Sequence, residues 1–284
     1  MRWKAFGGAE VGRLRSVVAA LAAGLLLRAI FVAHHPRFVG DTLVYGDLAQ
    51  NLLRHGVYGL TEERIRPTLI RLPGYPLFLA VCFSVFGVGR YVPVLWVQVG
   101  VDLLGCLLLW DLARRLFGMR VGLAVLWLAA LCPFTANYAA AALTETLSIF
   151  CVTAALWGLE RWWARGDGAL WALVVGCALM FAAVLRPDGG VLAAAMVPAM
   201  LWTGWRGGWV RRGVRDAAVA SAVVLGVLGI WAVRNWRVFH VVQPLAPKYA
   251  NDPGEDAPLG FARWYRTWGV GFGDTVRVYW VYDG

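Results

Sequence analysis

Residues 169–185 read ALWALVVGCALMFAAVL, a run of apolar and small residues without a single charge. A run of this length approaches the ~20 residues that a helix needs to cross the hydrocarbon core of a membrane. Sixty per cent of the 284 residues are hydrophobic and only 15% are charged, which is more apolar surface than a soluble domain of this length can bury. The sequence therefore predicts an all-α integral membrane protein.

Six further apolar runs flank this one, so the chain is predicted to cross the membrane seven times. The six further runs are residues 15–34, 91–112, 119–134, 143–160, 188–204 and 216–234. The first run is too long for a cleaved signal peptide and contains Arg28. The net charge of +10 does not indicate a nucleic-acid partner, because the basic residues lie in short loops between spans rather than on one soluble face.

The segment Gly74–Gly87 is apolar but short for a span, and its placement decides the side of every later loop. Cytoplasmic loops collect Lys and Arg. If the segment lies at the outer surface without crossing, the cytoplasmic segments 1–15, 112–120, 160–168 and 205–215 hold 13 basic residues in 44, against 13 in 119 for the outer segments. We therefore predict one span, a large outer loop over residues 35–90 with interfacial helices, and six more spans.

Two polar groups in this outer loop point to chemistry. Asp41 begins a predicted amphipathic helix that Gly56 should end, and Arg71 precedes the turn Leu72-Pro73-Gly74-Tyr75-Pro76. A carboxylate can take a proton from a hydroxyl nucleophile, and a guanidinium can hold a phosphate with two hydrogen bonds. The alternative for Asp41 is a helix N-cap without further role, and the alternative for Arg71 is a side chain that reaches to the interface.

These stretches also carry a family resemblance. The run Asp41-Thr-Leu-Val-Tyr45 to Tyr58, the run Arg71-Leu-Pro-Gly-Tyr-Pro, and later Leu143-Thr-Glu145, Arg186-Pro187 and Trp231-Ala-Val-Arg234-Asn235 resemble polyprenyl-phosphate-sugar-dependent glycosyltransferases of the GT-C fold. The resemblance is to the protein-mannosyltransferase and aminoarabinose-transferase type, covers about residues 14–240, and rests on the order and spacing of the motifs.

The resemblance implies roles for individual residues. Asp41 would be the general base, and Arg71 would contact the lipid phosphate. Members of the family often have a second acidic residue where this chain has Thr42, and some have an acidic metal ligand where it has Ile70. The sequence thus predicts no metal site and no cofactor, with a divalent metal ion as the weaker alternative.

Charged residues inside or near the spans complete the candidate set. Asp102 lies mid-span, and Arg28 is a candidate partner for it, with a lipid-phosphate channel as the alternative role. Arg186 and Arg234 lie at outer span ends, where they would join Arg71 in a cationic rim. The candidate catalytic residue is Asp41, and the candidate substrate-binding residues are Arg71, Tyr75, Glu145, Arg186 and Arg234.

The expected function is transfer of a sugar from a polyprenyl-phosphate donor to an acceptor at the outer face of the plasma membrane. Expected partners are this donor lipid, membrane lipids and an acceptor that the sequence does not name. A transporter or lipid flippase, and a non-catalytic scaffold, are the alternatives, although no inverted repeat supports the first. Residues 1–240 are predicted to form the membrane domain. Residues 241–284 are expected to be an outer tail that begins a missing C-terminal region and is dispensable for donor binding.

Overall fold

The chain folds almost entirely into helices, in a computed structural model that describes residues 3–38, 40–164, 168–256, 259–269, 271 and 278. In chain order the elements are α1 Trp3–His34, α2 Asp41–His55, β1 Gly59–Thr61, β2 Ile65–Pro67, α3 Gly74–Phe86, α4 Tyr91–Phe117, α5 Met119–Ala130, α6 Pro133–Ala139, α7 Glu145–Ala164, α8 Gly168–Leu185, α9 Gly189–Arg206, α10 Val210–Phe239 and α11 Leu259–Tyr265. The two short strands pair as one antiparallel hairpin. The predicted all-α membrane class is confirmed.

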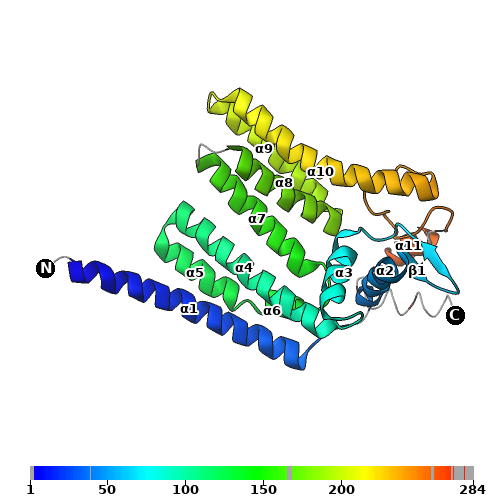
Figure 1. Cartoon of the computed structure of the whole chain (residues 1–284), viewed down its shortest axis with the longest axis horizontal. Coiled ribbons are helices and arrows are strands. Elements are labelled where there is room, and N and C mark those ends of the chain that lie inside the picture. The colour runs from blue at the N-terminus through cyan, green and yellow to red at the C-terminus, as the bar shows by residue number, and fades with distance from the viewer. Residues whose placement is uncertain are drawn as a thin grey trace.

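Six of the seven predicted apolar runs each fall on a single helix to within two residues at the start, and several helices extend beyond their run. The run 119–134, predicted as one continuous span, is instead broken at Leu131 and Cys132, between α5 and α6. Within the described residues, four helices are long and apolar enough to cross a membrane: Val11–His34 of α1, α4, α8 and α10. The bent pair α5 and α6 would make a fifth span. Helices α7 and α9 are 20 and 18 residues long and run beside these spans in the bundle (Figure 1). They are not among the four described helices that are long and apolar enough to cross, so their crossing stays a prediction.

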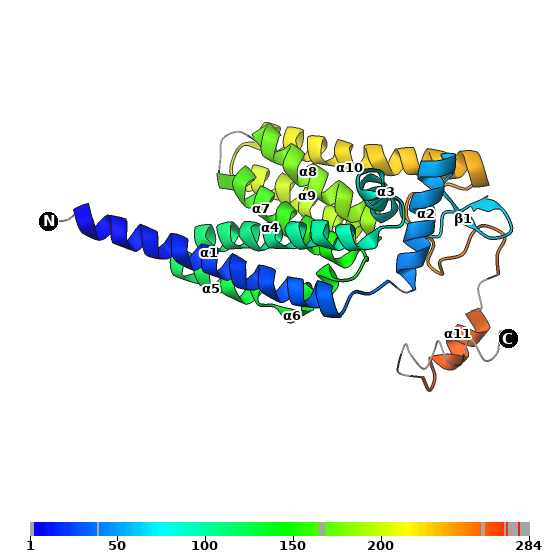
Figure 2. The same ribbon diagram turned by 60° about the horizontal axis from the view of Figure 1, so that its bottom comes forward.

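The two ends of the bundle differ in what they carry. The start of α1, the α4–α5 turn and the α9–α10 turn lie at one end, whereas α2, α3 and the hairpin lie at the other (Figures 1 and 2). Helix α1 ends and α4 begins at the same end, so the chain does not traverse the bundle between them. This arrangement agrees with the prediction that Gly74–Gly87 does not cross, and α3 within it has only 13 residues. We call the end with α2 and α3 the loop end.

A break between α5 and α6 is stabilised by a buried arginine. The two helices meet at an angle of 50°, and Pro133, the first residue of α6, has no N–H to continue the ladder. Arg28 of α1 is fully buried and donates to the carbonyl oxygens of Ala129 and Ala130 at the end of α5, at 3.4 and 2.5 Å. It also pairs with Asp102 of α4 at 2.5 Å. The predicted Arg28–Asp102 pairing is confirmed.

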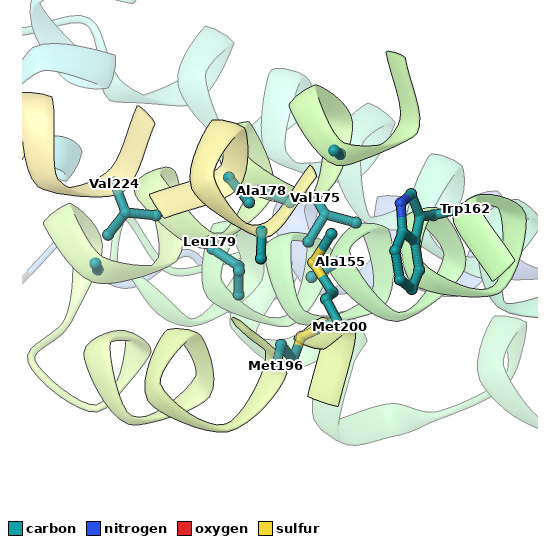
Figure 3. Packing of buried hydrophobic residues seen from close by; sticks show 12 residues of the cluster. Ala155, Trp162, Val175, Ala178, Leu179, Met196, Met200 and Val224 are labelled. Atoms are coloured by element: carbon teal, nitrogen blue, oxygen red, sulfur yellow. The ribbon is translucent and has the colours of Figure 1, made fainter. Parts of the chain in front are cut away.

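The largest hydrophobic cluster lies between α7, α8, α9 and α10 (Figure 3). Its labelled members include Ala155, Trp162, Leu179 and Met200. Small residues let the helices approach closely: a Cβ on Gly176 of α8 would lie 2.9 Å from a backbone atom of α10. The indole N–H of Trp162 is not left unpaired, because it donates to Asp216 of α10 at 2.8 Å. This packing fixes the relative positions of α7, α8, α9 and α10, and therefore of the loops and helices at the loop end that contact them.

Candidate active site

Asp41 and Arg71 form an ion pair at the loop end. The carboxylate Oδ1 of Asp41 lies 2.8 Å from Nη2 of Arg71, and the two side chains are 51% and 24% exposed. The alternative that Asp41 is a helix cap is wrong, because the N-cap of α2 is Gly40, with a φ of +62°. Asp41 is instead the first helical residue, and its carboxylate reaches sideways to the loop before α3. The predicted stop at Gly56 is confirmed by its left-handed φ of +66°.

The segment before α3 approaches α8 so closely that it needs glycine. A Cβ on Gly74 would lie 2.6 Å from the carbonyl oxygen of Val184, near the end of α8. The hydroxyl of Tyr58 donates to the carbonyl oxygens of Arg71 and Leu72 at 3.1 and 3.2 Å. The turn at Pro73 and Gly74 therefore packs directly against α8, while the side chain of Arg71 pairs with Asp41 of α2.

A second carboxylate–guanidinium pair lies where α7 begins and α8 ends. Nη1 of Arg186 lies 3.3 Å from Oε1 of Glu145, and its Nε lies 3.2 Å from Oδ1 of Asp188. These three side chains line a pocket of about 530 Å³. The rest of the lining comes from α6, α7, α8 and α9: Tyr138, Ser148, Ile149, Val152, Thr153, Ala182, Gly189 and Leu192. The lining of the pocket thus combines three charged groups with a mostly apolar surface.

Backbone contacts bring the start of α7 to the start of α2. Arg37 and Ala141 form an isolated parallel bridge between the linkers that precede the two helices. The hydroxyl of Thr42 donates to the carbonyl oxygen of Ala142 at 3.1 Å. Thr42 occupies the position where the resembled enzymes often carry an acid, and here it ties the two linkers together. Asp41 and Glu145 are thus placed at the same end of the bundle by residues adjacent to them.

Tyr45 is a phenol whose pKa is influenced by both ion pairs. It follows Asp41 by one helical turn, its side chain is almost fully buried, and its ring packs edge-on against Tyr75 at 5.1 Å. Burial raises the pKa of the Tyr45 phenol. The carboxylates of Asp41 and Glu145 raise this pKa further, while Arg71 and Arg186 oppose the shift. Charges from both ion pairs therefore act on the phenol of Tyr45.

Sequence reasoning did not select Tyr45 as a site residue. The signal was its spacing: residues at i and i+4 share a helix face, so Tyr45 had to lie beside Asp41. Asp188, which shares Arg186 with Glu145, was also missed. Its signal was its position two residues after Arg186 at the same span end.

Two predicted site residues lie apart from these charges. Tyr75 is fully buried, and its hydroxyl donates to Gln98 of α4 at 2.6 Å. Arg234 donates to the carbonyl oxygens of Thr68 and Tyr58 at 2.8 and 2.7 Å. Its guanidinium also lies over the ring of Trp231, 5.0 Å from the centroid. The predicted cationic rim therefore has Arg71 and Arg186 near Tyr45, while Arg234 supports the backbone behind Arg71.

An apolar groove of about 520 Å³ begins at the turn that follows Arg71. Pro73 and Gly74 form one edge, and side chains from α3, α4, α7, α8 and α10 form the walls. Its lining is almost wholly hydrocarbon, from residues such as Leu77, Phe150 and Val227. An arginine two residues before Pro73, which lines this groove, suits an amphiphile with an anionic head.

Among the residues that the structure describes, no three His, Cys, Asp or Glu side chains gather as a metal-binding set. Ile70 supplies no ligand beside Arg71, and Thr42 is engaged by Ala142. The residues at this site therefore do not fit a metal ion, and we derive no chemical step through one.

The fold and the site define a multi-pass membrane protein with a charged site and a lipid-sized groove at one end of its helix bundle. The model of the dolichyl-phosphate-mannose-protein mannosyltransferase family matches residues 67–232, which is more than half of the chain. The chain belongs to this family and is a membrane glycosyltransferase of the GT-C type. Enzymes of this family in general use polyprenyl-phosphate sugar donors. No curated protein matches the chain. The matched region contains Arg71, Glu145 and Arg186 and begins after Asp41.

Proposed function

We propose that the chain transfers a sugar from a polyprenyl-phosphate donor to an acceptor hydroxyl at the outer face of the plasma membrane, with Asp41 as the general base. The observation that carries this proposal is the ion pair of Asp41 and Arg71, since Arg71 lies two residues before Pro73, which lines the apolar groove. A base and a phosphate-binding cation are the two groups that such a transfer needs, and here they touch before any substrate arrives.

The donor phosphate would compete with Asp41 for Arg71. The phosphate diester of the donor can accept two parallel hydrogen bonds from one guanidinium, as a carboxylate does, and it gains a second negative charge when the bond to the sugar breaks. When it binds, Arg71 turns from the carboxylate to the phosphate, and Asp41 is left free as a proton acceptor. The prenyl chain of the donor would lie in the groove lined by Leu77, Phe150 and Val227. Donor binding and base activation are thereby linked.

The transfer step then balances without a cofactor. The acceptor oxygen attacks the anomeric carbon and loses its proton to Asp41, while the bond between that carbon and the phosphate oxygen breaks. The leaving polyprenyl phosphate gains negative charge. Arg71 offsets this charge, and Arg186, whose charge also acts on Tyr45, adds to the positive field. The pocket with Glu145 and Asp188 provides room for the sugar or the acceptor.

The test is product formation by the purified protein in lipid vesicles. Donor lipid labelled in its sugar is supplied with membrane extract as a source of acceptor. The proposal predicts that label moves to a new covalent product and that free polyprenyl phosphate appears, with both lost in Arg71→Gln. Label that crosses the vesicle membrane on intact donor lipid would instead support a flippase. Label that neither moves nor changes would support a scaffold without chemistry.

A further inference from the structure

The loop that carries Arg71 receives a contact from a segment far along the chain. The backbone N–H of Leu69, two residues before Arg71, donates to Oδ1 of Asp252 at 2.8 Å. Asp252 lies 183 residues later, beyond α10. Figure 2 shows the chain after α10 turning back beside α2 and β1. This contact joins the part of the chain after residue 240 directly to the donor loop.

The same loop is held on its carbonyl side by groups already described. Arg234 holds the carbonyl of Thr68, and Tyr58 holds those of Arg71 and Leu72. Asp252 accepts the backbone N–H of Leu69, while the N–H of Ile70 donates to the hydroxyl of Thr68 within the loop. A loop without regular secondary structure has few bonds of its own, so its shape depends on such side chains. Together these hydrogen bonds fix the position of the backbone from which the Arg71 side chain extends.

Asp252 is itself held in place. Its backbone N–H donates to the carboxylate of Glu255 at 2.8 Å, and the side-chain amide of Asn251 donates to the carbonyl of Glu255 at 3.2 Å. Earlier in the segment, Val241 and Ala246 pack against a buried cluster that contains Leu69. Residues 241–256 are therefore a packed strap across the donor loop. We use the name strap for these residues below.

We propose that Asp252 is a positioning residue that fixes Arg71 for the donor phosphate, and that the strap is part of the donor site. This inference rests on the proposed role of Arg71. It reverses the expectation that residues 241–284 are dispensable for donor binding, as far as the strap is concerned. Asp252 touches no substrate. It acts by setting the backbone from which Arg71 reaches the phosphate.

The test measures binding of unmodified polyprenyl phosphate to the full chain in lipid nanodiscs. Asp252→Ala removes the acceptor for Leu69 and should raise the Kd about tenfold. Asp252→Asn keeps a side-chain oxygen in the same place and should stay within about threefold of wild type. Asp256→Ala removes an exposed carboxylate four residues away and serves as the matched control. Thermal melting shows whether each variant is folded.

A double-mutant cycle separates positioning from general destabilisation. In the Arg71→Gln background, Asp252→Ala should change the Kd by less than twofold, because the side chain that it positions is gone. An equal loss in both backgrounds, or wild-type affinity of Asp252→Ala, would overturn the inference and leave the function untouched. Wild-type affinity of Arg71→Gln itself would overturn both.

A measurement on the wild-type chain covers the case in which Asp252→Ala does not fold. Deuterium exchange at the Leu69 amide should be slow in the wild type and in Asp252→Asn, since both supply an acceptor. Exchange as fast as that of an exposed loop amide would contradict the proposed contact and the inference with it.

Discussion

At the scale of single residues, Tyr45 connects the two ion pairs and gives a test by pH. Its pKa is raised by burial first and by Asp41 and Glu145 next, so the phenol stays neutral beyond the usual range near pH 10. The shift upward means that Tyr45 does not ionise at neutral or mildly alkaline pH and does not act as a base there. We expect Tyr45→Phe to leave the shape of the pH–rate profile unchanged up to about pH 10.

The measurement is kcat/KM of sugar transfer for wild type and Tyr45→Phe between about pH 5 and 10. The same shift affects stability, because the pKa of Tyr45 is higher in the folded chain than in the unfolded chain. The contribution of Tyr45 to the free energy of unfolding is therefore complete below the unfolded pKa, and it falls as the pH rises from the unfolded pKa through the folded pKa. Tyr45→Phe should therefore lessen alkaline destabilisation. An alkaline limb below pH 9 that disappears in the variant would show that the phenol titrates during catalysis.

At the scale of elements, the broken helix of α5 and α6 depends on Arg28. Arg28→Met removes the partner of buried Asp102 and the donors to Ala129 and Ala130. Loss of one member of a buried pair costs about 3–5 kcal/mol, because the other charge remains buried alone. We expect Arg28→Met to lower the melting temperature strongly. Arg28→Met combined with Asp102→Leu should recover part of the loss, and a double variant as unstable as the sum of the single ones would contradict this account.

The elements also show what the sequence could and could not predict. Apolar runs predicted the helices, because burial in lipid demands them, and two costly charges in neighbouring spans predicted the Arg28–Asp102 pair. The sequence could not show that Asp41 pairs with Arg71 rather than capping α2, because this depends on the φ of Gly40 and on a loop 30 residues away. Likewise, the sequence groups Arg234 with the other arginines, although two of its hydrogen bonds go to the backbone carbonyls of Thr68 and Tyr58, which no side-chain pattern reveals.

At the scale of the whole molecule, all the candidate chemistry lies at one end of the bundle, and the side that this end faces can be measured. Single cysteines are placed in a chain whose five native cysteines have been replaced. Val88 beside α3 and Phe117 at the end of α4 suit this purpose, with 39% and 70% of their surface exposed. The neighbouring Gly89 and Gly118 have φ values of +77° and +90°, which cysteine would strain.

We expect an impermeant thiol reagent added outside to label Val88→Cys and to spare Phe117→Cys. Phe117 lies at the end of the bundle that carries the segments rich in Lys and Arg, and these segments predict that this end is cytoplasmic. The opposite labelling pattern would place the Asp41–Arg71 site in the cytoplasm. Labelling of both positions only after the membrane is permeabilised would mean that α3 and the α4–α5 turn lie on the same side.

The central claim is that Asp41 serves as the base for sugar transfer, and Asp41→Asn tests it most directly. The substitution keeps the size of the side chain and removes its basic oxygen, while α2 keeps its Gly40 cap. General-base assistance is worth about 10²–10⁴ in rate, so single-turnover transfer should fall at least about a hundredfold. Polyprenyl-phosphate affinity should stay at the wild-type level or rise, because Arg71 is no longer paired with a carboxylate. Transfer at the wild-type rate, or a loss matched by Asp47→Asn, whose carboxylate only binds Thr61 of the hairpin, would contradict the claim.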